Sequence, residues 1–248
     1  MRRADVAMYA AKAAGRNRAH VYSEALDRDR DNDRLIAQEL RQVIERRQLE
    51  VVYQPIVNAR TRHVAGVEAL VRWPSKHPVQ YTPDIFVPIA EQFGLIEDLG
   101  RFVLTEACRQ AARWDDIFVS VNVSPIQFMN PSFADMVEDI LTLSGLAAGR
   151  LEIEVTEGFV IDNAERAKAI INRLHESHVS VALYDFGTGY SSLAYLQDLE
   201  FDVLKVDRVF INNATANGRG PLLGAIAGLA RSIGATAVAE GVETLEQL

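Results

Sequence analysis

Hydrophobic and polar positions follow two different periods along the chain. Short apolar runs rich in β-branched residues predict strands over Val51–Val57, Val64–Trp73, Phe118–Ser124, Leu151–Thr156, Val179–Asp185, Val203–Asp207 and Ala235–Glu240. Longer amphipathic stretches predict helices between most of them, over Pro83–Trp114, Ser132–Ser144, Asn163–His178 and Gly220–Ile233. Alternating strands and helices predict an α/β fold with a parallel sheet covered by helices. Seven strands in roughly 200 residues favour a barrel over an open sheet.

Two segments precede this region. Residues 1–22 are basic and alanine-rich, and they are too short to form a domain. Residues 23–48 carry dense, mixed charges, with apolar residues such as Leu35, Ile36 and Leu40 at helical spacing, which predicts a surface helix leading into the main body. The main domain is therefore predicted over residues 49–248.

Most of the predicted strands carry one ionisable or amide residue near the C-terminal end. These residues are Glu68, Asn122, Glu154, Asp185, Lys205 with Asp207, and Glu240. In barrel enzymes the active site is built at this end of the strands, so these side chains can converge at one mouth. Converging carboxylates repel one another unless a cation lies among them. Oxygen-rich sets suit Mg²⁺ or Mn²⁺ better than zinc, and two such ions suit the hydrolysis of a phosphate ester.

Composition narrows the function classes. The chain has 248 residues, 48% of them hydrophobic and 24% charged, which fits a globular protein with one substantial core. A formal net charge of −8 argues against a protein that binds polymeric nucleic acid by neutralising phosphates. No apolar run approaches the roughly 20 residues of a membrane span, and no signal peptide is evident, so we expect a cytoplasmic domain without membrane contact. Cys108, the single cysteine, is expected in the core.

The block Glu68-Ala69-Leu70-Val71-Arg72-Trp73 resembles the signature of the EAL phosphodiesterases. Supporting blocks follow in family order from about residue 35 to the end: Tyr53-Gln54-Pro55-Ile56, Val121-Asn122-Val123-Ser124, Glu154-Val155-Thr156-Glu157, Asp185-Phe186-Gly187-Thr188-Gly189, Lys205-Val206-Asp207 and Val238-Ala239-Glu240-Gly241-Val242-Glu243. So dense an agreement is highly specific.

This resemblance implies a modified TIM (β/α)₈ barrel that opens cyclic di-GMP to linear pGpG with two Mg²⁺ or Mn²⁺ ions. By position in the family, the metal ligands would be Glu68, Asn122, Glu154 and Asp185. The catalytic set would be Glu68, Lys205 and Glu240, with Glu157 anchoring the loop after Asp185. Substrate contacts would come from Gln54, Leu70, Arg72 and Asp207. The family also implies a homodimer.

Residues 1–22 resemble the closing helix and strand of a GGDEF diguanylate cyclase domain. The resemblance lies mainly in Ala4–Tyr9 and Ala11–Asn17. It implies that the parent protein is a GGDEF-EAL fusion. Nothing in this segment retains a cyclase site, so no cyclase activity is predicted.

The chain departs from the family pattern at two places. The family has two adjacent aspartates before Phe-Gly-Thr-Gly, the first of which bridges the metals, and here that first position is Tyr184. A tyrosine has a pKa of about 10 and a larger side chain, so we expect a weakened or missing second metal site unless a neighbouring acid or a water fills the gap. The sequence also stops at Leu248, before the family's last strand, so the barrel is expected to lack that strand and to expose unpaired edges.

Three functions therefore remain open. The leading hypothesis is a cyclic di-GMP phosphodiesterase, and the sequence leaves open whether Tyr184 impairs it. The second is a catalytically inactive receptor that binds cyclic di-GMP, which Tyr184 favours. The third is an unrelated metal-dependent barrel enzyme acting on a small carboxylate, which the carboxylate set alone would fit.

Overall fold

The computed structural model describes residues 19, 21–74, 81–157, 163–186, 198–211, 220–244 and 247. The chain divides into two compact units, Met1–Leu49 with Trp73–Leu95, and Glu50–Arg72 with Ile96–Leu248. None of the described helices combines the length and the apolar character needed to cross a membrane. Most of the segment predicted as a cyclase remnant, residues 1–22, lies outside the described residues.

The first unit is helical. It contains α2 (Glu24–Glu45) and α3 (Pro83–Gln92), and α2 confirms the helix expected before the main body. Of the apolar positions of α2 that repeat at helical spacing, Ile36 and Leu40 become buried, whereas Leu35 stays exposed. Trp73 packs its ring against Phe86 of α3, with the ring centroids 5.8 Å apart, so an aromatic contact secures the second segment of this unit.

The single helix expected over Pro83–Trp114 is wrong, because the structure has two. The chain leaves α3 at Phe93 and begins α4 (Ile96–Ala111) after a short break. Gly94 lies in this break with a φ of 69°, a left-handed conformation that glycine adopts readily and that ends helices. The amphipathic pattern continues across the break, which is why periodicity alone did not reveal it.

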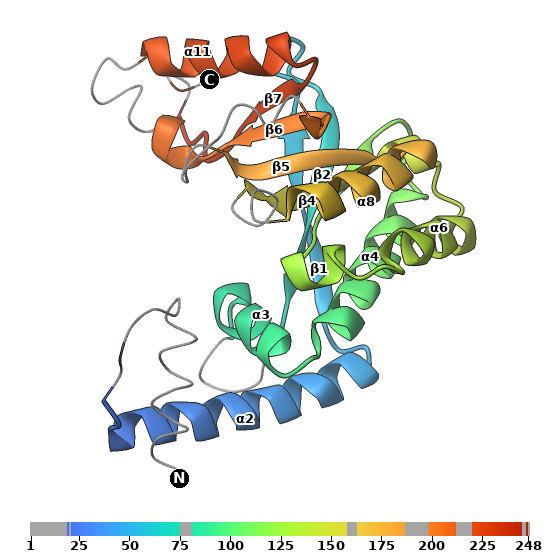
Figure 1. The fold of residues 1–248 in the computed structure, drawn as a ribbon. Coiled ribbons are helices and arrows are strands. Elements are labelled where there is room, and N and C mark those ends of the chain that lie inside the picture. The colour runs from blue at the N-terminus through green and yellow to red at the C-terminus, as the bar shows by residue number, and fades with distance from the viewer. Residues whose placement is uncertain are drawn as a thin grey trace. The chain divides into compact units, whose positions relative to one another are not determined.

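The second unit is built on one sheet of seven strands in sequential order (Figure 1). Its strands are β1 (Glu50–Val57), β2 (Val64–Arg72), β3 (Phe118–Asn122), β4 (Leu151–Thr156), β5 (Ser180–Phe186), β6 (Val203–Val206) and β7 (Thr236–Ala239). All seven predicted strands are thereby confirmed, with small shifts at their ends. Within the described residues β1 and β7 are the two edges of this curled sheet.

The sheet is parallel from β2 to β7, but β1 runs antiparallel to β2. A wholly parallel sheet was therefore the wrong expectation for its first strand. The connection between β1 and β2 is too short for the crossover that a parallel pair requires. Within it, the side chain of Asn58 accepts hydrogen bonds from the backbone of Arg60 and Thr61, at 3.0 Å each, and closes a hairpin turn.

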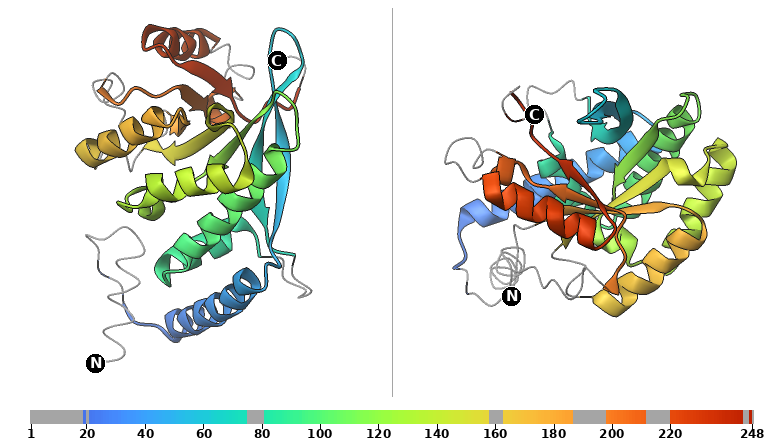
Figure 2. Two further views of the ribbon diagram at one scale, coloured as in Figure 1. Left: turned by 90° about the vertical axis from the view of Figure 1, so that its right-hand side faces the viewer. Right: turned by 90° about the horizontal axis from the view of Figure 1, so that it is seen from above.

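Helices cover one face of the sheet (Figure 2). They are α4, α6 (Phe133–Ser144), α8 (Ala164–Glu176) and α11 (Gly220–Ser232), with a short α5 (Pro125–Phe128) after β3 and a 3-10 turn, η1 (Ala148–Arg150), before β4. Cys108 of α4 is buried, as expected. The architecture is a modified TIM barrel, which places the carboxyl ends of β2 to β7 at one mouth.

Candidate active site

A buried lysine lies at the centre of this mouth. The side chain of Lys205, on β6, contacts three carboxyl groups: Nζ lies 2.5 Å from Oε1 of Glu154, 3.0 Å from Oε1 of Glu240 and 3.2 Å from Oε2 of Glu68. Lys205 is 1% exposed and Glu154 is 1% exposed. One cation thus faces three acids, which come from β2, from β4 and from the residue after β7. Water screens the fully buried contact with Glu154 least, because Glu68 and Glu240 are partly exposed.

Strand register explains why these side chains meet. Asn122 pairs with Glu154 across β3 and β4, and the amide of Asn122 donates to Oε1 of Glu68 at 2.7 Å. Glu240 follows β7, and its backbone N–H donates to the carbonyl of Val206. The alternation of each strand therefore delivers one polar side chain to a common centre.

Two further side chains lie beneath this centre. The hydroxyl of Ser120 on β3 lies 2.6 Å from Oε1 of Glu152 and contacts Oε1 of Glu154. All three residues are buried. Because a hydroxyl carries one hydrogen, both contacts are hydrogen bonds only when one of the two carboxyls is itself protonated.

Burial dominates the electrostatics of these acids. It raises the pKa of Glu154 to about 7, although the neighbouring ammonium of Lys205 acts in the opposite direction. It also raises the pKa of Glu152, against the hydrogen bond from Ser120. Burial alone would lower the pKa of Lys205, but the carboxylates of Glu154, Glu68 and Glu240 outweigh it and raise that pKa. The three carboxylates therefore favour the charged form of Lys205.

Tyr184 joins the same cluster. It lies on β5, paired with Thr156 of β4, and the centroid of its ring is 5.6 Å from Nζ of Lys205. At this distance the ring face attracts the ammonium by a cation–π interaction. The residue that replaces the expected aspartate thus lies in the site itself, and it offers a ring where a carboxylate was anticipated.

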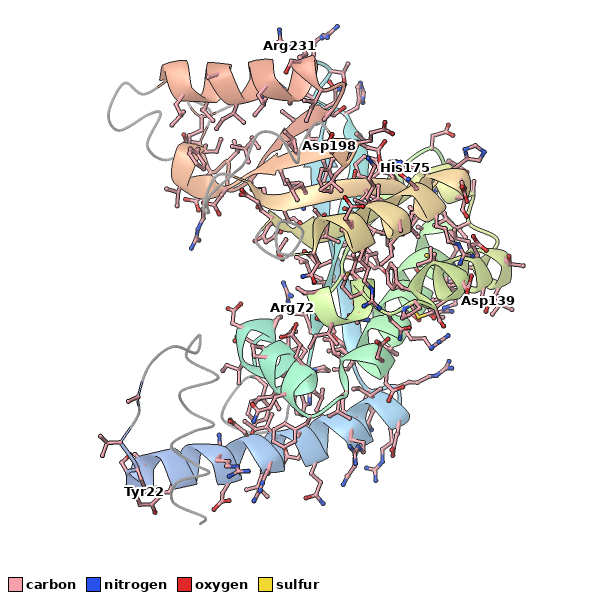
Figure 3. The ribbon with its side chains drawn as sticks, viewed as in Figure 1. Tyr22, Arg72, Asp139, His175, Asp198 and Arg231 are labelled. Atoms are coloured by element: carbon pink, nitrogen blue, oxygen red, sulfur yellow. The ribbon has the colours of Figure 1, made fainter. Side chains whose placement is uncertain are left out.

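The predicted substrate contacts occupy different settings. Gln54 is exposed on β1 opposite Glu68, and Leu70 is half-buried on β2. Arg72, labelled in Figure 3, ends β2, and its Nη1 donates to the carbonyl of Val71 at 2.9 Å. Asp207 follows β6 and accepts from the backbone N–H of Val209 at 2.8 Å.

Two predicted residues are described only in part. The backbone of Asp185 belongs to β5, directly after Tyr184, but its side chain lies outside the described structure. Glu157 is buried immediately after β4, and the loop that it would anchor also lies outside the described residues.

The donor set fits a hard divalent cation in its chemistry. Among the described side chains, no group of three or more His, Cys, Asp and Glu residues is arranged to hold a metal ion. The side chain of Asp185 is not one of those described. Glu68, Asn122 and Glu154 nevertheless bring carboxylate and amide oxygens together, which are the ligands that Mg²⁺ and Mn²⁺ prefer. Oε2 of Glu154 is buried and has no hydrogen-bond partner in the described part of the chain. Such an acceptor costs free energy unless a cation or another donor meets it.

Comparison with known proteins decides the family, because the EAL domain matches residues 37–248. The chain belongs to the EAL family. This membership removes the basis for an unrelated barrel enzyme. It also shows that family resemblance begins within α2, ahead of the first strand.

Curated relatives are similar to this EAL domain over its whole length. The bifunctional diguanylate cyclase/cyclic di-GMP phosphodiesterase MucR of Pseudomonas aeruginosa is 40% identical over 98% of the chain. The cyclic di-GMP phosphodiesterase NbdA of the same organism is 40% identical over 100% of the chain. The chain spans only about a third of these relatives, 36% of MucR and 32% of NbdA.

A solved structure supports the fold. The complex of the PaMucR phosphodiesterase with c-di-GMP superposes with a TM-score of 0.81 at 40% identity, over 86% of this chain and 89% of that one. The modified TIM barrel is thereby confirmed.

Sequence reasoning identified five members of the cluster by their strand-end positions: Glu68, Asn122, Glu154, Lys205 and Glu240. It assigned no role to Ser120 or Glu152. The available signal was that Ser120 precedes Asn122 by two residues, as Glu152 precedes Glu154, so each shares a strand face with a predicted ligand.

Proposed function

We propose that this EAL domain is a metal-dependent phosphodiesterase that hydrolyses cyclic di-GMP to linear pGpG. The observation that carries the proposal is the buried ammonium of Lys205 held among Glu68, Glu154 and Glu240 at the mouth of an EAL barrel. Relatives named as cyclic di-GMP phosphodiesterases support the substrate. In this reaction water attacks the phosphorus of one phosphodiester and the bond to the 3′ oxygen breaks, which leaves a 5′ phosphate on the linear product.

Glu68, Asn122, Glu154 and Asp185 would hold Mg²⁺ or Mn²⁺. When bound, such ions lower the pKa of water and stabilise the charge that develops on the phosphate. Lys205 has two tasks in this scheme. Its ammonium fixes the orientation of two proposed ligands, Glu68 and Glu154, and it places a positive charge where the transition state gains negative charge. Glu240 shares this ammonium and would orient the attacking water.

Substrate binding would fall to residues around the mouth. Arg72 offers a planar fork of donors suited to a phosphate, and Gln54, Leu70 and Asp207 would contact the nucleotide. Glu157 would anchor the loop after Asp185, through which a homodimer would form. For the chain as a whole we propose three segments: the tail of a GGDEF domain over residues 1–22, a linker and helix over residues 23–48, and the EAL barrel over residues 49–248.

A receptor that binds cyclic di-GMP without hydrolysing it is the second candidate. Tyr184 favours it, because a neutral ring near Lys205 stands where the family has a metal-bridging carboxylate. The two functions share ligand binding and differ in turnover.

Chromatography separates the two candidates. The purified protein would be incubated with cyclic di-GMP and Mg²⁺ or Mn²⁺, with EDTA in a parallel sample, and analysed for linear pGpG. Product formed only with metal supports the enzyme. Intact cyclic di-GMP that nevertheless binds to the protein supports the receptor, and failure of both overturns the proposed ligand.

A further inference from the structure

The two oxygens of the Glu154 carboxyl have different surroundings. Oε1 accepts from Nζ of Lys205 at 2.5 Å and also contacts the hydroxyl of Ser120. Oε2 is buried and has no hydrogen-bond partner among the described atoms. Both neighbours thus converge on Oε1, and Oε2 is left without a partner among the described atoms. A carboxylate held in this way presents one oxygen in a fixed direction.

Ser120 is well placed to fix that direction. It lies on β3 with 0% exposure, and its register partner on β4 is Glu152. The hydroxyl bridges Glu152 and Glu154, so it is restrained from both sides. Lys205 alone would restrain Glu154 less than Lys205 and Ser120 do together, because the ammonium is shared with Glu68 and Glu240.

We propose that Ser120 is a positioning residue, whose hydroxyl holds Glu154 so that Oε2 points to a bound divalent cation. The inference rests on the proposed function, since it assumes that Glu154 is a metal ligand. Groups that hydrogen-bond a metal ligand from behind fix its orientation, and their loss typically weakens metal binding about 10–100-fold. Ser120 itself does not touch the metal or the substrate in this scheme.

A purely structural role predicts a different result. Alanine fills nearly the same volume as serine, so Ser120→Ala changes core packing little. If Ser120 served packing alone, its replacement would leave metal affinity unchanged. If its hydroxyl positions Glu154, Ser120→Ala weakens metal binding more than it lowers the stability of the fold.

The test is a Mn²⁺ titration followed by electron paramagnetic resonance of the free ion, which measures affinity without requiring turnover. Ser120→Ala should weaken Mn²⁺ binding about 10–100-fold. Ser120→Thr keeps the hydroxyl and should restore most of the affinity. Ser144→Ala is the matched control, because the Ser144 hydroxyl donates to the carbonyl of Leu141 on α6, and it should bind Mn²⁺ like the unmodified protein.

Each outcome has one meaning. Unchanged Mn²⁺ affinity in Ser120→Ala overturns this inference and leaves the proposed function standing. An unmodified protein that binds no Mn²⁺ overturns both. Thermal unfolding in EDTA checks that the variants fold, and should Ser120→Ala fail to fold, Ser120→Cys replaces it with a weaker donor of similar size, where full affinity again overturns the inference.

Discussion

Two basic side chains lie at opposite ends of the parallel strands. Arg150 immediately precedes β4, and its guanidinium donates to the carbonyls of Ala111, Ile117 and Trp114 at 2.8 to 2.9 Å. Lys205 on β6 instead meets three carboxyl groups at the other end. The first cation is surrounded by neutral acceptors, and the second by acids.

The difference separates a structural site from the proposed functional one. Neutral carbonyls accept three hydrogen bonds from Arg150, which tie the end of α4 and the start of β3 to the start of β4. Around Lys205 the acids outnumber the cation, and one buried acceptor, Oε2 of Glu154, has no partner among the described atoms. An excess of buried acid is costly unless further positive charge arrives. The excess of acid at the mouth of the barrel therefore fits the proposed cation site, whereas the contacts of Arg150 at the opposite end serve the fold.

The strongest test of this contrast is Glu68→Ala. It should lower hydrolysis of cyclic di-GMP by more than about 100-fold, because removing a direct ligand should cost at least as much as removing an outer partner. Product chromatography measures the loss, and circular dichroism should show an intact fold. Glu138→Ala, on the outer helix α6, is the matched control and should retain full activity. Full activity in Glu68→Ala would show that the site is misassigned.

At the opposite end, Arg150→Met should act on stability and leave the chemistry alone. We expect the free energy of unfolding to fall by about 2 kcal/mol, since the variant loses charged hydrogen bonds to three carbonyls. Urea unfolding in EDTA measures this change. Mn²⁺ affinity of the folded variant should stay the same, and a large drop in it would contradict the separation of the two ends.

Tyr184→Asp tests the departure from the family. Restoring a carboxylate beside Lys205 should raise both turnover and Mn²⁺ affinity about tenfold or more, an effect on the scale of changes around metal ligands. Tyr184→Phe keeps the ring without the hydroxyl and should not produce this gain. If Tyr184→Asp shows no gain, another feature limits the reaction.

The smallest effect concerns pH. Burial raises the pKa of Glu154 to about 7 from an ordinary value of 4.5. As pH rises between these values, the unfolded chain releases its proton first, so the contribution of Glu154 to the stability of the metal-free protein falls. We expect a loss on the order of 1 kcal/mol, measured by urea unfolding in EDTA at about pH 5 and pH 7.5. Glu154→Gln should flatten this dependence, and an unchanged slope would contradict it.

Sequence reasoning located the seven strands and the core of the site because both depend on local alternation. A polar residue such as Glu68 or Lys205 at the end of an apolar strand is visible in the sequence, and parallel strands bring such ends together. The reversed direction of β1 follows from its short connection to β2, which the alternation of strands and helices does not take into account. The break between α3 and α4 depends on the left-handed backbone of Gly94, which the hydrophobic pattern does not show. Ser120 received no role because, although its shared strand face with Asn122 is visible in the sequence, its contacts with Glu152 and Glu154 depend on the register of β3 and β4.

The reversed first strand also determines where the chain reaches the barrel. Because β1 is antiparallel, Glu50 at its start pairs with Arg72 at the end of β2. The polypeptide therefore joins the sheet at the mouth that holds the candidate site, and the hairpin turn lies at the far end. Residues inserted into that turn would extend the molecule away from the mouth. A displacement of the segment before Glu50 would instead be transmitted directly to β1, the strand that carries Gln54.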